Sequence, residues 1–214
     1  MYLPAQFTET RPERLQEVMQ QAGLVTLVTL SDDGLEASHL PMLYDPAVAT
    51  DGSAPHGTLY GHLARGNPQW RRFQAGVEAL AIFQGPDAYI TPSWYETKRQ
   101  NGKVVPTWNY VAVHAYGTLR AFEGADELRQ LVTRLTNRHE GQRASPWAVT
   151  DAPADYIDAM LKGIVGLALP ISRLEGKWKM SQNRNKPDQA GVVVGLRADG
   201  DDVVANIVAE VTSG

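Results

Sequence analysis

The sequence predicts an α+β fold that is mainly antiparallel β, with a closed or partly closed barrel, peripheral helices and a helical C-terminal tail. Short β-branched, apolar segments separated by turn residues come first, and helical patterns follow them. Strands and helices do not alternate regularly along the chain, so a Rossmann sheet is not expected. The 214 residues are 43% hydrophobic and 21% charged, which suits a globular protein with a sizeable core.

The first part of the chain predicts one helix followed by strands joined through tight turns. Pro12 suits a first helical position, and Leu15, Val18 and Met19 recur at helical spacing. An Asp-Gly pair then gives a hairpin signal. The expected elements are a helix over Arg11–Ala22, strands over Leu24–Leu30, Leu35–Tyr44, Thr58–Leu63 and Val77–Phe83, the last continuing through Ala88–Thr91, and a short helix over Asn67–Phe73.

The second part predicts a long strand, two helices, one more strand and a helical end. Pro92–Val104 is expected to be a polar loop. Alternation in Val105–Phe122 places Trp108, Tyr110, Ala112, His114 and Tyr116 on one face of a strand. The remaining expected elements are helices over Ala125–His139 and Ala154–Leu161, a strand over Ile164–Leu174 that Trp178 extends, and two helices within Pro187–Thr212. Residues 1–186 are expected to form the barrel domain and residues 187–214 a helical appendage.

Composition excludes several classes of protein. There is no cysteine, so disulfides, thiolate catalysis and cysteine zinc sites are ruled out. The five histidines show no helical zinc spacing, and no P-loop, Gly-x-Ser-x-Gly or Gly-x-Gly-x-x-Gly motif occurs. No apolar run is long enough for a membrane helix, and Met1–Pro4 does not resemble a signal peptide, so a cytoplasmic location is expected.

Polar groups cluster first where a predicted strand meets a predicted helix. Ser38–Pro41 ends one strand, and Gly61–Pro68 places Arg65 between a strand and a helix N-terminus. Free amide groups, the helix dipole and a forked guanidinium together favour an anion such as phosphate. The alternative is that His62 is a solvated edge residue and Asn67 only a helix cap.

Two later segments combine cations, amides and aromatic rings. Thr91–Lys98 and Val105–Tyr110 hold two aromatic pairs beside Lys98, which suits a flat, partly polar ring system, although such aromatics are often core or interface residues. Lys177–Arg184 adds two lysines, a serine, two amides and an arginine after an apolar strand. It is either a second phosphate or ring-edge clamp that reaches into a partner subunit, or a solvated basic strand end.

These blocks, taken in order, resemble the PaiB-type family of FMN-binding negative transcriptional regulators. The resemblance runs from residue 1 to about residue 190 and rests on Met1–Pro4 with Phe7, His39–Pro41, Gly61–Trp70, Ser93–Tyr95 with Lys98, Val105–Tyr110 with Val113–His114, and Lys179–Arg184. It implies an FMN-binding split β-barrel that dimerises, with FMN in a cleft between two subunits. Gly66 departs from the alanine that is more usual there.

The resemblance also implies candidate cofactor residues. Arg65 and Lys98 are expected on the phosphate side. The neighbours of the cofactor are expected to be His39, Leu40, Gly61, His62 and Asn67, and the remaining wall Trp108, Asn109, Tyr110, Lys179, Ser181, Gln182 and Arg184. No residue stands out as a catalytic acid or base, although His62 and His114 could serve.

Three functions remain open on this sequence. The family resemblance implies a repressor that binds DNA, but the net charge of −4 and the absence of a helix-turn-helix give it little support. Arg129, Arg134, Arg138 and Arg143 form either a basic stripe for DNA or a solvated helix face. The alternatives are a flavin-dependent oxidoreductase that uses NAD(P)H and a haem-binding split barrel with His39 or His62 as axial ligand.

Overall fold

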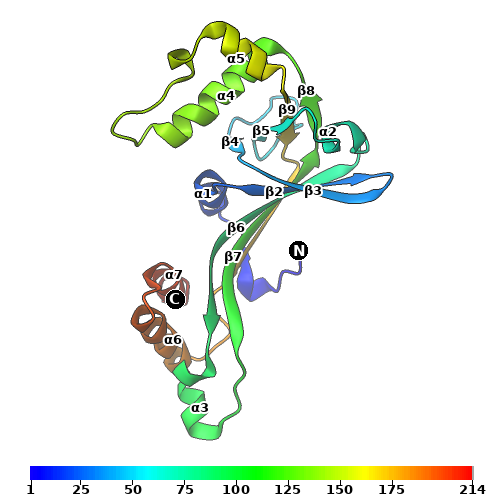
Figure 1. The fold of residues 1–214 in the computed structure, drawn as a ribbon. Coiled ribbons are helices and arrows are strands. Elements are labelled where there is room, and N and C mark those ends of the chain that lie inside the picture. The colour runs from blue at the N-terminus through cyan, green and yellow to red at the C-terminus, as the bar shows by residue number, and fades with distance from the viewer. Residues whose placement is uncertain (214) are drawn as a thin grey trace. The chain divides into compact units, whose positions relative to one another are not determined.

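The computed structural model describes residues 1–213 and has a mixed α+β fold (Figure 1). One sheet has six strands in the order β1-β10-β7-β6-β2-β3, namely Thr8–Glu9, Arg173–Lys179, Thr107–Thr118, Glu78–Ile90, Val25–Ser31 and Gly34–Leu40. The other has four strands in the order β4-β5-β9-β8, namely Leu43–Asp45, Thr58–Ala64, Ile164–Pro170 and Arg120–Phe122. The pairs β1–β10, β2–β3, β2–β6, β4–β5, β5–β9 and β8–β9 are all antiparallel, as predicted.

Seven α-helices and three short 3₁₀ turns accompany the sheets within residues 1–213. The helices are α1 Pro12–Gln21, α2 Gln69–Arg72, α3 Glu96–Asn101, α4 Ala125–Glu140, α5 Ala154–Leu161, α6 Lys186–Ala198 and α7 Asp202–Thr212. The 3₁₀ turns are Ala5–Phe7, Pro92–Trp94 and Val149–Asp151. The expected helices at α1, α4, α5, α6 and α7 are therefore confirmed. None of the described helices is long and apolar enough to cross a bilayer.

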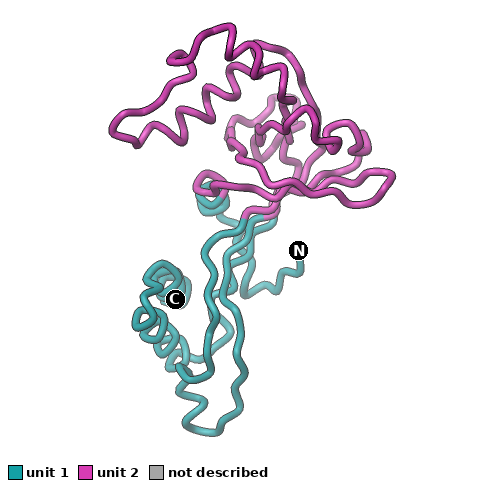
Figure 2. Tube along the Cα trace, viewed as in Figure 1, with its two compact units in different colours: residues 1–18, 84–113, 175–214 teal, residues 19–83, 114–174 magenta. Residues whose placement is uncertain are grey.

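The chain divides into two compact units, drawn in teal and magenta in Figure 2. Unit 1 comprises residues 1–18, 84–113 and 175–214, and unit 2 comprises residues 19–83 and 114–174. Strands β6, β7 and β10 each have residues in both units. Helices α6 and α7 belong to unit 1. The expected boundary at residue 186 concerns independent folding and stays a prediction.

Three expected strands are each two strands in the structure. Val105–Phe122 breaks at Leu119, so that β7 lies in the six-stranded sheet and β8 in the four-stranded sheet. The other two are Leu35–Tyr44 and Ile164–Leu174. Leu35–Tyr44 breaks at Pro41–Met42, so that β3 lies in the six-stranded sheet and β4 in the four-stranded sheet. Ile164–Leu174 breaks after Pro170 into β9 and β10. These last two breaks lie next to a proline, which cannot donate a ladder hydrogen bond. After the break at Pro170 the backbone turns, because Ile171 N–H donates to Gly57 O at 2.9 Å.

The prediction of a polar loop over Pro92–Val104 is wrong, because this segment contains a 3₁₀ turn and helix α3. The N-terminal end of α3 is capped from a distance. The Asp188 carboxylate, on α6, accepts hydrogen bonds from Thr97 N–H and Thr97 Oγ1, both at 2.8 Å. Gly102, with φ of 69°, adopts the left-handed conformation that ends the helix. The cap that stabilises α3 is therefore contributed by a residue far away in the sequence.

Glycines in α6 allow a tryptophan to pack against this helix within unit 1. A Cβ atom on Gly195 would lie 2.2 Å from Trp94 Cδ2, and one on Gly191 would lie 2.0 Å from Trp94 O. Neither position could carry alanine without displacing Trp94. Trp94, which belongs to one of the aromatic pairs in the sequence, is thus a packing residue for α6.

Candidate functional site

The fourteen predicted cofactor residues divide between the two units. The unit 1 group consists of Lys98, Trp108, Asn109, Tyr110, Lys179, Ser181, Gln182 and Arg184. The unit 2 group consists of His39, Leu40, Gly61, His62, Arg65 and Asn67. The two groups differ in whether a carboxylate balances the charge of their cations.

The centre of the unit 1 group is the segment Lys177–Arg184, called the basic loop, which includes the end of β10 and the turn after it. Ser181 has a φ of +66°, the one positive φ outside glycine among the described residues. This conformation is unfavourable for a residue with a Cβ atom, so surrounding contacts must hold it. Asn109 does so: its amide donates to Ser181 Oγ at 3.0 Å, and the hydroxyl donates to Asn109 Oδ1 at 3.2 Å. Both residues are buried.

Two glutamines fix the rest of the basic loop. Gln182 Oε1 accepts from Met180 N–H at 2.7 Å, and Gln182 Nε2 donates to Trp178 O at 2.6 Å. Gln189 Nε2, from α6, donates to Arg184 O at 2.8 Å and to Ser181 O at 3.3 Å. Gln189 was not among the predicted residues, and it lies in an ordinary helical pattern that gives no signal of its role. The loop is therefore held in one conformation by the side-chain amides of Gln182 and of the buried Gln189.

The basic loop carries positive charge without a compensating carboxylate. Burial, together with the positive charges of Lys177 and Arg184, holds the pKa of Lys179 below its ordinary value. Within residues 1–213, none of these three cations forms an ion pair with Asp or Glu. Like charges at this proximity disfavour one another, so an anion bound here would relieve the repulsion.

Aromatic rings accompany these cations in unit 1. Lys177 Nζ lies 5.2 Å from the centre of the Tyr110 ring, and the Arg184 guanidinium lies 4.4 Å from that of Tyr95. Lys179 Nζ donates to Thr107 Oγ1 at 2.5 Å and to the carbonyl oxygen of Trp108. The remaining predicted cation, Lys98, is exposed and donates to Ser93 Oγ at 3.0 Å.

In unit 2 the guanidinium of Arg65 is already paired. Its Nε donates to Lys162 O at 2.6 Å and its Nη2 to Ile164 O at 3.0 Å. Its Nη1 pairs with the carboxylate of Glu123. The guanidinium thus ties the end of β5 to the start of β9 and has its charge balanced by Glu123. Its phosphate role stays a prediction, and the structure gives it a structural role as well.

The other unit 2 residues lie in a polar network and beside it. Asn67 Nδ2 donates to Ser38 Oγ at 3.0 Å, and Asn67 Oδ1 accepts from Gln69 N–H at 2.9 Å. Asn67 thus forms a local turn that leads into α2, whose N-cap position is Pro68. His39 Nδ1 lies 3.0 Å from Thr26 Oγ1 across the β2–β3 hairpin. Gly61 lies close to Leu40, because a Cβ atom there would be 3.0 Å from Leu40 Cδ1.

His62 lies on the face of β5 that α4 covers. Tyr60, two residues earlier in the strand, lies on the same face and packs against Leu43, Leu131 and Leu135. Burial lowers the pKa of His62, and its Nδ1 atom is buried without a hydrogen-bond partner in the described residues. A buried neutral imidazole explains both observations. Among residues 1–213 no group of three or more His, Asp or Glu side chains could hold a metal ion.

The four arginines of the predicted basic stripe are all engaged within unit 2. Arg129, Arg134 and Arg143 pair with Asp158, Asp45 and Glu140, respectively. Arg138 donates to three backbone carbonyls, those of Gln20, Ala22 and Met42. The stripe is therefore a network of structural contacts, which leaves little free positive charge on α4 for DNA phosphates.

Solved structures with this fold include flavin-binding proteins. The FAD and heme binding protein of Mycobacterium smegmatis aligns with a TM-score of 0.58 at 19% identity, over 80% of this chain and 73% of that one. The flavocytochrome Anf3 of Azotobacter vinelandii aligns with a TM-score of 0.56 at 9% identity, over 86% and 75% of the two chains. At these identities the comparisons establish the fold, which is that of the flavin-binding split barrels.

Sequence comparison then identifies the family. Residues 1–173 match the family described as "Putative FMN-binding domain", and the chain belongs to this family. It is 37% identical over 197 residues to "Protease synthase and sporulation protein PAI 2" of Bacillus subtilis, covering 92% of this chain and 89% of that protein. An uncharacterized protein of Emericella nidulans is 36% identical over 243 aligned positions, covering 98% and 97% of the two chains. The resemblance to the PaiB-type family is confirmed, and FMN is the cofactor.

The residues of unit 1 fit FMN. FMN joins a flat ring system to a phosphate, and the basic loop offers uncompensated cations beside aromatic rings. When bound, FMN supplies reversible electron transfer, while the chain supplies binding and orientation.

Proposed function

We propose that the chain is a homodimeric FMN-binding regulatory protein in which the basic loop of unit 1 holds the flavin phosphate. The observation that carries this proposal is the set of three cations, Lys177, Lys179 and Arg184, that no carboxylate balances in the described residues. Arginine and lysine at a strand end are suited to phosphate, arginine as a fork and lysine as a point charge.

The rigidity of the basic loop supports the same assignment. A left-handed Ser181, held by the buried Asn109, fixes the turn between the lysines and Arg184. Strained conformations of this kind concentrate at binding sites, because the surrounding structure must stabilise them. A loop that is fixed before the ligand arrives loses less conformational entropy on binding.

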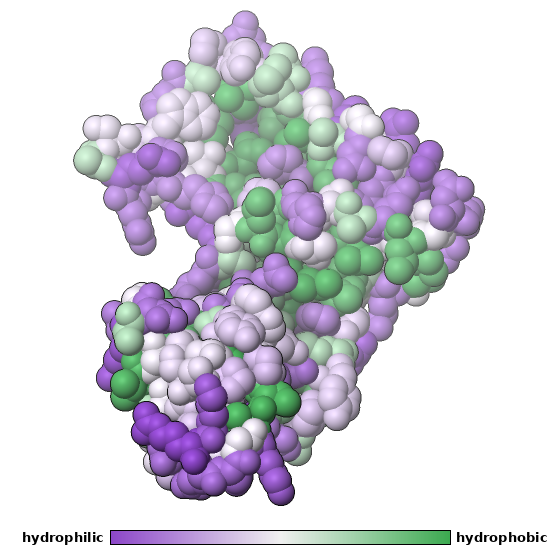
Figure 3. All heavy atoms as spheres, turned by 60° about the horizontal axis from the view of Figure 1, so that its bottom comes forward, coloured by the Kyte–Doolittle hydropathy of each residue, from purple (hydrophilic) through white to green (hydrophobic). Residues whose placement is uncertain are grey.

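Exposed aromatic side chains in unit 1 support a dimer. Trp108 and Tyr89 form an edge-to-face pair with ring centres 5.9 Å apart, yet 55% and 49% of their surfaces are exposed. Val105 in the same unit is 66% exposed. Figure 3 shows hydrophobic residues, in green, reaching the surface among hydrophilic ones on the face that it draws. Exposed aromatics of this kind are typical of protein interfaces, and the family resemblance implies a cleft for FMN between two subunits.

A set of cation deletions tests the phosphate assignment. Lys179→Met and Arg184→Met should each weaken FMN binding by about 1.5 to 3 kcal/mol, the range for hydrogen bonds to charged groups, which is roughly 10- to 150-fold in the dissociation constant. The exposed Lys103→Met is the matched control and should bind FMN normally. Arg65→Met, which removes a guanidinium already paired with Glu123, should cost less than either loop variant. Fluorescence titration of apoprotein with FMN measures all four. Unchanged affinity in both loop variants would remove the basic loop from the site.

Mass in solution tests the dimer. Multi-angle light scattering of the FMN-loaded protein should give twice the chain mass of 23.5 kDa. Trp108→Glu should shift the protein to monomer and weaken FMN binding, because a buried unpaired carboxylate opposes association. A wild-type protein that is monomeric with FMN bound would overturn the dimer.

The regulatory role rests on the printed name of the Bacillus subtilis relative, which connects that protein with protease synthesis and sporulation. Electrophoretic mobility shifts at low salt, where phosphate contacts are strongest, test whether this chain binds DNA. Absence of any shift would remove the regulatory proposal in its DNA-binding form. Bleaching of bound FMN by NADH or NADPH would instead favour an oxidoreductase, and a haem absorption band would contradict FMN as the cofactor.

A further inference from the structure

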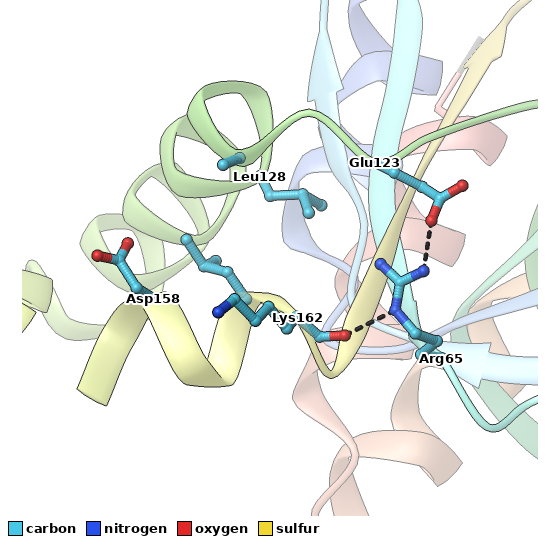
Figure 4. A pocket seen from close by; sticks show the side chains of 7 residues that line it. Arg65, Glu123, Leu128, Asp158 and Lys162 are labelled. Carbon is cyan, nitrogen blue, oxygen red and sulfur yellow. Dashed lines mark hydrogen bonds and ion pairs between the residues drawn. The ribbon is translucent and has the colours of Figure 1, made fainter. Parts of the chain in front are cut away.

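A pocket lies entirely within unit 2, beside the ends of α4 and α5. Its volume is about 320 Å³, at the lower end of the range for small-molecule sites. Figure 4 shows Asp158 and Lys162 on one side, Arg65 and Glu123 on the other, and Leu128 of α4 between them. We call it the helix pocket. None of the residues of the basic loop lines it.

The floor of the helix pocket is apolar. Leu128 and Leu161 line it and belong to a buried cluster with Val149 and Ile157, and Ala125 lines it at the first position of α4. A short aliphatic group could lie against the small area that the nearly buried Leu128 and Leu161 still expose and remove it from water. The floor alone favours a ligand with a small hydrophobic part.

Charged side chains of both signs surround this floor, and they differ in whether their charged atoms already have partners. Glu123 uses one carboxylate oxygen, Oε2, for Arg65, and Asp158 uses one, Oδ1, for Arg129. The second oxygen of each carboxylate has no partner in residues 1–213, and neither does the ammonium of Lys162. The pocket therefore presents one free cation and two free carboxylate oxygens.

We propose that the helix pocket binds a free α-amino acid with an apolar side chain of about the size of leucine. Lys162 receives the ligand carboxylate, and the N-terminal end of α4, which reaches the pocket at Ala125, adds a favourable dipole. The free oxygens of Glu123 and Asp158 receive the ligand ammonium. The side chain lies on Leu128 and Leu161. A ligand that carries only one of the two charges leaves part of this lining unmatched.

Isothermal titration calorimetry of the FMN-loaded protein with L-leucine tests the proposal. Two analogues dissect the recognition: 4-methylpentanoate lacks the ammonium, and leucinol lacks the carboxylate. Each should bind at least about tenfold more weakly than leucine, the effect of losing one charge-assisted hydrogen bond. L-glutamate and L-lysine, with charged side chains over an apolar floor, should bind more weakly still. Equal affinity for leucine and either analogue would overturn the recognition of a zwitterion.

Two isosteric variants localise the binding. Lys162→Met and Asp158→Asn should each weaken leucine binding at least about tenfold. Both side chains are exposed, so the fold should persist. FMN binding, measured on the same samples, should be unchanged, because neither residue belongs to the basic loop. Lys103→Met is again the control. No heat with leucine at millimolar concentration, or undiminished binding in both variants, would refute the pocket without affecting the assignment of the FMN phosphate.

Discussion

Replacing Asn109 with alanine tests whether buried hydrogen bonds hold the basic loop. Asn109 has no exposed surface, and its amide exchanges hydrogen bonds of 3.0 and 3.2 Å with the hydroxyl of Ser181. Two such bonds contribute about 1 kcal/mol each, and a buried hydroxyl left without a partner costs about 1 to 3 kcal/mol. Because these terms overlap, we expect Asn109→Ala to lower the free energy of unfolding by about 2 to 4 kcal/mol.

Urea unfolding of the apoprotein, followed by circular dichroism, measures this loss. A double-mutant cycle with Ser181→Ala isolates the pair and should give a coupling energy of about 1 to 2 kcal/mol. FMN affinity should also fall in Asn109→Ala, because the loop no longer holds its cations in place. A loss below about 0.5 kcal/mol, within the range of ordinary surface substitutions, would refute the reasoning, as would strict additivity in the cycle.

Three further predictions concern other parts of the fold. Gly195→Ala should destabilise the protein because the new Cβ atom would overlap Trp94, although alanine has a helix propensity about 1 kcal/mol better than glycine. Gly66→Ala is the control and should not destabilise, because a Cβ atom there meets nothing within 4 Å. Thermal unfolding compares the two variants. Arg138→Met should lower the free energy of unfolding in urea by at least about 2 kcal/mol, because three carbonyls lose their hydrogen-bond donor. Arg134→Met removes an exposed ion pair and should lower it by less than about 1 kcal/mol. Because burial lowers the pKa of His62, the unfolded chain binds a proton that the folded chain does not. Stability should therefore decrease as pH falls below about 6.5, by at most about 1.4 kcal/mol per pH unit, and His62→Gln should remove that decrease in urea unfolding at several pH values.

Elements encoded by local pattern could be predicted from the sequence. The β2–β3 hairpin follows from its Asp-Gly turn, and Gly34 there indeed has a positive φ of 112°. The alternation predicted for β7 is also found, with Trp108 and Tyr110 less buried than Asn109 and Val111. In each case the determining residues are neighbours in the sequence, so period and turn chemistry suffice.

Features that depend on distant partners could not be predicted. Helix α3 follows from the Asp188 carboxylate that caps Thr97, 91 residues earlier in the chain. The change of sheet between β9 and β10 depends on hydrogen bonds from Ile171 and Ser172 to Gly57 and Tyr116. Local propensity carries no information about such contacts.

The candidate site was predictable in its residue types but not in its charge balance. The sequence indicates cations at Arg65 and in the basic loop alike, because both follow predicted strands. Only the structure distinguishes them: Glu123 lies beside Arg65, whereas no carboxylate of residues 1–213 pairs with Lys179. Charge pairing across about 60 residues of sequence cannot be derived from composition or spacing.

This difference in charge balance distinguishes the arginines of α4 from the cations that we propose to bind FMN. On α4, each arginine that pairs with a carboxylate or caps carbonyls has a reason to be present without any ligand. In the basic loop the two lysines also donate to carbonyls, Lys177 to Tyr2 O and Lys179 to Trp108 O. No carboxylate within residues 1–213 pairs with them or with Arg184, however, and Ser181 is held in an unfavourable conformation. A fold keeps an arrangement that costs it stability when a ligand compensates that cost. FMN, with its phosphate dianion, is a ligand of the charge and shape that this arrangement requires.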